Sequence, residues 1–186
     1  GTNDAPVITS DAQTGSVTED TQLTASGVVT SSDVDNGATA TYTVANGTGD
    51  YGTLALDSTT GAWTYTLDNA NHQNLAAGET QTDVFTVTVS DGKGGSANAT
   101  LTNRINGTND APTISVQTGD QAGVDLNEPA SAGTKLTANG SLTLRDVDTS
   151  DKVNVEVASV SISGPTGSLS VIREVPVMDR VPAEWT

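Results

Sequence analysis

The chain has 186 residues, of which 34% are hydrophobic and only 3% are aromatic. This length allows one or two domains, with cores built mainly from Val, Leu, Ile and Ala. The 23 acidic and 7 basic side chains give a formal charge of -16, which disfavours nucleic acids and anionic membrane surfaces as partners and makes a cation the natural one. The sequence contains no cysteine, which excludes disulfides, thiolate metal sites and cysteine catalysis.

The chain opens with Gly1-Thr2-Asn3-Asp4-Ala5-Pro6, and the same six residues return 106 positions later as Gly107-Thr108-Asn109-Asp110-Ala111-Pro112. That spacing is about the length of one antiparallel β-sandwich domain. The proline that closes each copy favours a short, stiff connector. We therefore predict a complete repeat over residues 1–106, a linker over 107–112, and a second, divergent and truncated repeat over 113–186. No stretch resembles a signal peptide or a membrane span, and an opening within a motif indicates a piece of a longer chain.

Seven strands are predicted in the first repeat, separated by polar turns and without helical periodicity. They cover residues 7–9, 23–29, 39–44, 54–56, 62–67, 85–89 and 98–105. The segment Ser16-Val17-Thr18-Glu19 is interpreted as an acidic turn. The predicted fold class is all-β, with tandem antiparallel Greek-key β-sandwiches of the cadherin or immunoglobulin type.

The direction of successive strands predicts which loops meet. If every strand reverses the one before it, Glu19, Asp68 and the second linker lie at one end of the first repeat. The loops at the opposite end carry the first linker, Asp33, Asp35, Asp57 and Asp91. Carboxylates should therefore gather at the two ends of the sandwich.

The second repeat can be aligned with the first by eye. Glu128 falls where Glu19 does, and Asp146-Val147-Asp148 falls where Asp33-Val34-Asp35 does. Residues 167–171 resemble 52–56, and residues 184–186 match 62–64, which would stop the chain inside the fifth strand. The alternation of Val and Ile changes phase after Val157, so a bulge is expected near Ala158-Ser159.

Several ordered motifs distinguish the first repeat from a generic sandwich. Besides the two linkers, they are Ser16-Val17-Thr18-Glu19-Asp20, Asp33-Val34-Asp35, Tyr51-Gly52-Thr53-Leu54, Thr60-Gly61-Ala62-Trp63-Thr64-Tyr65 and Phe85-Thr86-Val87-Thr88-Val89-Ser90-Asp91-Gly92. With these motifs, residues 1–112 resemble a VCBS-type, cadherin-like repeat of the giant RTX adhesins that bacteria export by type I secretion. The resemblance implies a secreted, cell-surface protein. Its partners would be neighbouring repeats of the same chain, and a surface glycan or protein would be bound by other domains.

The cadherin-like pattern implies Ca²⁺ held between tandem domains by an acid after the first strand, an Asp after the fifth, the linker and the next domain's Asp-x-Asp. Here those positions are Glu19, Asp68, Asn109, Asp110, Asp146 and Asp148. Calcium takes about six to eight hard oxygens, which carboxylates and carbonyls supply. A second, incomplete set is expected at the opposite end, with the preceding domain as its missing partner: Asn3, Asp4, Asp33, Asp35 and Asp91. Ala70 stands where the cadherin pattern has another acid, which leaves the number of ions open.

These features predict a non-catalytic extender segment that calcium stiffens. The alternative is a calcium-dependent module that binds a carbohydrate or a peptide, for which Trp185 is the candidate aromatic side chain. No nucleophile elbow, Gly-rich phosphate loop or zinc pattern accompanies the lone His72, which is expected to be a solvated loop residue. Asp57 is interpreted as a turn residue rather than a ligand.

Overall fold

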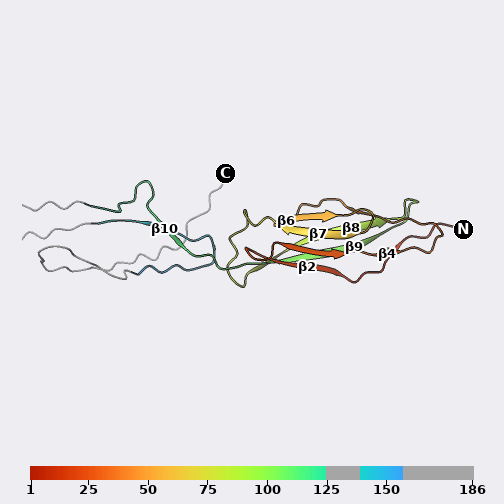
Figure 1. Cartoon of the computed structure of the whole chain (residues 1–186), viewed down its shortest axis with the longest axis horizontal. Coiled ribbons are helices and arrows are strands. Elements are labelled where there is room, and N and C mark those ends of the chain that lie inside the picture. The colour runs from red at the N-terminus through yellow and green to blue at the C-terminus, as the bar shows by residue number, and fades with distance from the viewer. Residues whose placement is uncertain (125–138, 157–186) are drawn as a thin grey trace, which may run out of the picture.

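The computed structural model describes residues 1–124 and 139–156 (Figure 1). All helix or strand structure in these ranges consists of β-strands. The same ranges contain no helix that is long and apolar enough to cross a membrane. The strands of the first repeat lie along the long axis of the molecule, with the N terminus at one end and the connection to β10 at the other (Figure 1).

Nine strands precede the second linker, and two follow it among the described residues. They are β1 (Val7–Ile8), β2 (Gln13–Thr18), β3 (Thr24–Val28), β4 (Ser31–Ser32), β5 (Thr41–Val44), β6 (Gly52–Leu56), β7 (Ala62–Leu67), β8 (Thr80–Ser90), β9 (Ser96–Asn106), β10 (Thr113–Ser115) and β11 (Thr143–Arg145). The two sheets of the sandwich have the orders β2-β9-β8-β5 and β3-β7-β6, and the pairs β1-β4 and β10-β11 each form a separate two-stranded sheet. Only β2 and β9 pair in parallel among these described strands. The predicted all-β sandwich is therefore confirmed.

The core lies between the two sheets, where alternate side chains of each strand point inward. On β7, Trp63, Tyr65 and Leu67 are buried, and the intervening threonines are exposed. On β8, Phe85, Val87 and Val89 face the same core. The alternation predicted for these two strands is confirmed.

The first strand is divided, which the sequence pattern did not predict. β1 pairs with the two-residue β4 in a separate small sheet, whereas β2 joins the four-stranded sheet and pairs with β9. Residues 16–18, the end of β2, were interpreted as part of an acidic turn, because Val17 is the one large apolar side chain that β2 buries. Its other inward positions are Gln13, whose Oε1 accepts a hydrogen bond from Trp63 Nε1 (2.9 Å), and Gly15.

β8 begins at Thr80, five residues before the predicted start. The prediction missed these residues because a buried acid interrupts the hydrophobic pattern of the strand. Asp83 is only 3% exposed. Its carboxylate accepts hydrogen bonds from the N–H groups of Asp50, Tyr51 and Gly52 and from the Tyr65 hydroxyl, at 2.7–3.1 Å. A buried charge with four donors is stable in the core, but hydrophobic periodicity cannot predict it.

The described part of the second segment repeats the start of the first. β1 and β10 each begin directly after a linker proline, and each pairs antiparallel with a short strand that ends directly before Asp-Val-Asp. The two segments therefore begin alike, and the division of the chain at residues 107–112 stays a prediction. The predictions for Glu128, for the bulge near Ala158-Ser159 and for residues 167–171 and 184–186 lie outside the described residues.

Candidate metal centre

Each linker binds the Asp-x-Asp turn that follows it in the chain. At the first, the N–H of Asp4 donates to Asp35 Oδ2 at 2.8 Å. At the second, the N–H of Asp110 donates to Asp148 Oδ2 at 2.7 Å. Within each turn, the N–H of the second Asp donates to Oδ1 of the first, at 2.9 Å from Asp35 and 3.1 Å from Asp148. The two copies of the motif therefore fold alike.

Glu19 joins the first domain to the second linker. It follows β2 directly, and its N–H donates to the carbonyl of Asn106 at the end of β9 (3.1 Å). Its side chain is fully buried, and Oε2 accepts a hydrogen bond from the Thr108 N–H at 3.2 Å. The strand prediction that Glu19 lies beside the second linker is therefore correct.

Three carboxylate oxygens at this junction are buried without a hydrogen-bond partner: Glu19 Oε1, Asp110 Oδ2 and Asp148 Oδ1. They come from the first domain, the linker and the following segment. A buried carboxylate oxygen without a donor carries a desolvation cost that a cation can offset. A cation placed among these three oxygens would offset that cost.

The electrostatics of the same carboxylates agree with this placement. Burial raises the pKa of Glu19, and the charges of Asp20, Asp110 and Asp148 add to the rise. Burial also raises the pKa of Asp110, and Asp20, Asp148 and Asp146 add to that rise. Without a cation, these groups repel one another.

Asp20 is a member of this group that the sequence analysis missed. It adopts the left-handed conformation, with a φ of 61°, which Asp tolerates better than most residues. Its Oδ1 accepts hydrogen bonds from Asn69 and Gln73 (2.9 and 3.0 Å), and its Oδ2 accepts one from the Thr108 hydroxyl (3.2 Å). The first of these bonds is the main reason that the pKa of Asp20 is lowered. The sequence signal for Asp20 was its place directly after Glu19, but the role of Asp20 depends on the loop around Asn69.

Two predicted ligands of the junction lie apart from the buried oxygens. Asp68 is exposed, and its Oδ2 accepts a hydrogen bond from Asn71 Nδ2 at 2.8 Å. Asn109 is exposed too, and its Nδ2 donates to the carbonyl of Asp110 at 2.7 Å. The structure therefore brings Glu19, Asp110, Asp146 and Asp148 together but leaves Asp68 and Asn109 at the surface.

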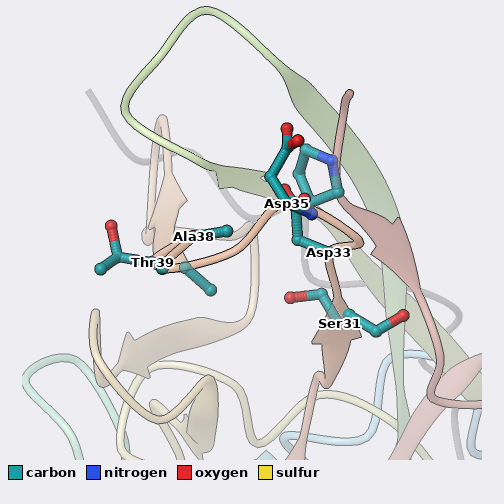
Figure 2. A pocket seen from close by; sticks show the side chains of 9 residues that line it. Ser31, Asp33, Asp35, Ala38 and Thr39 are labelled. Atoms are coloured by element: carbon teal, nitrogen blue, oxygen red, sulfur yellow. Dashed lines mark hydrogen bonds between the residues drawn. The ribbon is translucent and has the colours of Figure 1, made fainter. Parts of the chain in front are cut away.

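The predicted set at the opposite end is also connected. Asn3 Nδ2 donates to Asp91 Oδ2 (2.8 Å), and Asp91 is buried with further hydrogen bonds from the N–H groups of Lys93 and Gly95. Asp33 Oδ2 is buried without a partner. Beside it is a cavity of about 190 Å³, lined by Pro6, Ser31, Ser32, Asp33, Asp35, Gly37, Ala38, Thr39 and Ala40. Figure 2 shows Asp33 and Asp35 together above Ser31 at one side of this pocket, with Ala38 and Thr39 at the other.

The residues at the junction fit a hard divalent cation. Carboxylate oxygens are the ligands that calcium prefers, and three of them are buried without donors. No group of three or more His, Cys, Asp or Glu side chains in residues 1–124 and 139–156 is already arranged as a metal-binding cluster. The carboxylates therefore lie near one another without converging, and they would have to move together around an ion.

Two loop residues outside these sets were also assigned from the sequence. Asp57 Oδ1 accepts hydrogen bonds from the N–H groups of Thr59 and Thr60, both at 2.9 Å, which confirms its role in a turn. His72 is not the solvated side chain that was expected. It is half-buried, with its ring centroid 4.9 Å from that of Tyr51, because the β7–β8 loop folds back on the domain.

Comparison with known proteins agrees with this architecture. The family model described as "Bacterial cadherin-like domain" matches residues 3–107. The chain therefore belongs to the family of bacterial cadherin-like domains. No curated protein matches the chain.

Solved structures of cadherin domains are similar at low sequence identity. Protocadherin gamma B2 extracellular cadherin domains 1–5 show 22% identity and a TM-score of 0.49, over 77% of this chain and 26% of that one. Mouse cadherin-23 EC22–24 shows 22% identity and a TM-score of 0.40, over 62% and 38%. Human mucin-like protocadherin EC1–2 shows 23% identity and a TM-score of 0.37, over 56% and 54%. The chain spans about a quarter to a half of these structures.

Proposed function

We propose that this chain is a non-catalytic extender segment of a bacterial cell-surface adhesin, in which calcium stiffens the junction between consecutive cadherin-like domains. The observation that carries the proposal is the set of buried, unpartnered oxygens of Glu19, Asp110 and Asp148. These oxygens belong to three consecutive parts of the chain. A cation that binds all three would fix the linker to the domains on both sides.

The residues of the junction act by binding and orientation. Glu19 and Asp148 already bind the backbone of the linker through one oxygen each, at the N–H groups of Thr108 and Asp110. Their other oxygens remain available to a cation, and Asp146 and Asp110 add negative charge. When bound, calcium would supply the positive charge that removes the repulsion between these carboxylates.

The mechanism is thermodynamic linkage. An ion that binds only the assembled junction stabilises it by about 2.7 kcal/mol when its free concentration is about 100 times the dissociation constant. Extracellular calcium modules often bind at about 10⁻⁴ to 10⁻³ M. The same chain would then be loose in a low-calcium cytoplasm and stiff outside the cell, which suits export before folding. We place the protein at the bacterial surface, with neighbouring repeats as its partners.

The ligand-binding alternative receives no specific support from the described residues. Tyr42, Trp63, Tyr65 and Phe85 are buried in the core, and Tyr51 packs on His72. Trp185, the aromatic residue proposed for such a site, lies outside the described residues. Domains of this family are generally adhesion or structural modules without catalytic activity, so we propose the same for this chain.

The test is thermal unfolding of the full chain in calcium, in magnesium and in chelator. We expect a large rise in Tm with calcium alone. The double variant Asp110→Ala, Asp148→Ala removes two of the three unpartnered oxygens, so it should lose most of that rise.

The matched control is Asp11→Ala, Asp50→Ala. It removes the same number of charges from exposed side chains of the first repeat. Its response to calcium should equal that of the wild type. An unchanged Tm of the wild type in calcium would contradict the proposed function.

A further inference from the structure

The pairing of β2 with β9 differs from every other described strand pair because it is parallel. Six residue pairs connect Gln13–Thr18 with Leu101–Asn106. β2 lies near the start of the chain, and β9 leads directly into the second linker. The chain enters the first domain at one end and leaves at the other (Figure 1).

This parallel pairing determines how the domain responds to a pulling force applied at its two ends. β2 would be pulled toward the N-terminal end and β9 toward the linker, along the axis that both strands share. All six pairs then slide against one another and share the load. In the antiparallel hairpin of β8 and β9, a force applied across one open end would break the pairs one after another. β1 meets the force first but pairs with β4 over only two residues.

Side chains reinforce the β2–β9 pair where the force from the linker arrives. Asn106 Nδ2 donates to the carbonyl of Val17 at 2.7 Å and to the hydroxyl of Ser16 at 3.0 Å. The N–H of Glu19 donates to the carbonyl of Asn106 at 3.1 Å. Thr108 adds the bonds to Glu19 and Asp20 described above. The C-terminal end of β2 is therefore attached to β9 by side-chain hydrogen bonds as well as by the backbone ladder.

We propose that the parallel β2–β9 pair, closed by Asn106, is a mechanical clamp that lets the domain transmit tension between its two ends. The biological purpose of the clamp rests on the proposed extender function. Its mechanical strength does not, because neither the ladder nor the bonds of Asn106 involve a metal.

The test is single-molecule force spectroscopy of the full chain in chelator. Because the chain has no cysteine, attachment points can be chosen freely. Thr2→Cys with Ala111→Cys pulls the domain end to end and shears the clamp. Ala12→Cys with Thr100→Cys pulls β2 from β9 at one end of their pairing and peels it. We expect a rupture force several-fold higher in the first geometry, because forced unfolding measures the barrier of the loaded element.

A matched pair of substitutions on β9 assigns the effect to the clamp. Asn106→Ala removes the side-chain bonds to β2, and we expect it to lower the end-to-end rupture force. Asn98→Ala removes one side-chain bond to Thr88 on β8 (2.8 Å), outside the residues paired with β2. We expect the rupture force of Asn98→Ala to stay at the wild-type value.

Equal rupture forces in the two pulling geometries of the wild type would overturn the clamp, and so would equal effects of the two substitutions. The comparison of the two pulling geometries needs neither substitution, so it still tests the clamp if Asn106→Ala fails to fold. If calcium leaves the Tm unchanged but the rupture forces still differ between the two pulling geometries, only the proposed stiffening by calcium is overturned. A normal calcium effect with equal rupture forces would overturn the clamp alone.

Discussion

At the scale of single residues, the stability of the domain depends on polar groups as well as on its small apolar core. Asp83 and Asn103 lie opposite each other on β8 and β9, and both are buried. Asp83 has four donors, whereas neither polar atom of the Asn103 side chain has a hydrogen-bond partner. The two residues therefore contribute to stability in opposite directions.

Asp83→Leu should destabilise the first domain strongly. The substitution leaves three backbone N–H groups and the Tyr65 hydroxyl without an acceptor, and each buried unsatisfied group costs about 1–3 kcal/mol. We expect a loss of about 3 kcal/mol or more in the free energy of unfolding, measured by urea denaturation. The exposed control Asp50→Ala should stay within about 0.5 kcal/mol of the wild type. A similar small change for Asp83→Leu would contradict this role.

The stability contribution of Glu19 should depend on pH when calcium is absent. Burial and neighbouring charges raise its pKa in the folded chain above the ordinary value of 4.5. The stabilisation from its proton is complete below that ordinary value and is lost as the pH rises through the raised folded pKa. In chelator at neutral pH, a neutral amide at this position removes the cost of burying the carboxylate charge, so Glu19→Gln should melt at a higher temperature than the wild type.

Two further measurements check this prediction. The difference between Glu19→Gln and the wild type should disappear as the pH falls below 4.5, because the Glu19 carboxyl is then protonated in both the folded and the unfolded chain. In saturating calcium at neutral pH the order should reverse, since the variant loses a ligand. Glu156→Gln changes an exposed carboxylate and should show neither effect. A variant less stable than the wild type in chelator at neutral pH would refute the argument.

At the scale of strands, Gly15 on β2 leaves room for the side chains of Asn103 on β9 and Ala25 on β3. A Cβ atom added at Gly15 would collide with the Oδ1 of Asn103 and would lie 3.0 Å from the Cβ of Ala25. Gly15 and Asn103 are register partners in the parallel pair. The position of the Asn103 side chain over residue 15 therefore requires a glycine there.

Gly15→Ala should destabilise the domain by about 1–3 kcal/mol, the usual cost of overpacking. In an Asn103→Ala background the same substitution should cost less, because the shorter side chain makes room. A double-mutant cycle measured by urea denaturation gives this coupling directly. Additive effects of the two substitutions would show that the collision with Asn103 is not the cause.

At the scale of the whole molecule, the calcium effect should need both sides of the junction. A chain shortened to residues 1–108 retains the matched cadherin-like domain and Glu19 but lacks Asp110 and Asp148. It should unfold cooperatively in chelator, and its Tm should rise less with calcium than that of the full chain. In this short chain, Asp33→Asn with Asp35→Asn should remove any remaining rise, which would belong to the opposite end. A short chain with the full calcium response would place the ion elsewhere.

Much of the architecture could be predicted from local patterns. The alternation on β7 and β8 identified the faces that carry Trp63 and Phe85, because side chains point alternately to opposite faces of a strand. Counting strand reversals placed Glu19 beside the second linker and Asn3 beside Asp91. These predictions succeed because each depends on neighbouring residues or on a simple alternation.

Other features were not accessible in this way. β2 has little hydrophobic signal because two of its inward residues are not large and apolar. Gln13 accepts a hydrogen bond from Trp63, and Gly15 leaves room for the side chain of Asn103. Asp20 joins the candidate site through the loop around Asn69, whereas Asp68 is turned to the surface by Asn71. Each of these outcomes depends on a partner that lies far away in the sequence or on the path of one loop.

The sequence by itself therefore determined the repeated linker, the all-β fold class and the gathering of acids at the ends of the sandwich. Each of these follows from repeated residues and from the two-residue period of strands. Only the tertiary structure decided that β2 pairs in parallel with β9, that Asp83 is buried with four donors, and which carboxylates at the junction keep an unpartnered oxygen. The physical reason is that pairing, burial and hydrogen bonding are properties of contacts between distant segments, and no single segment encodes its partners.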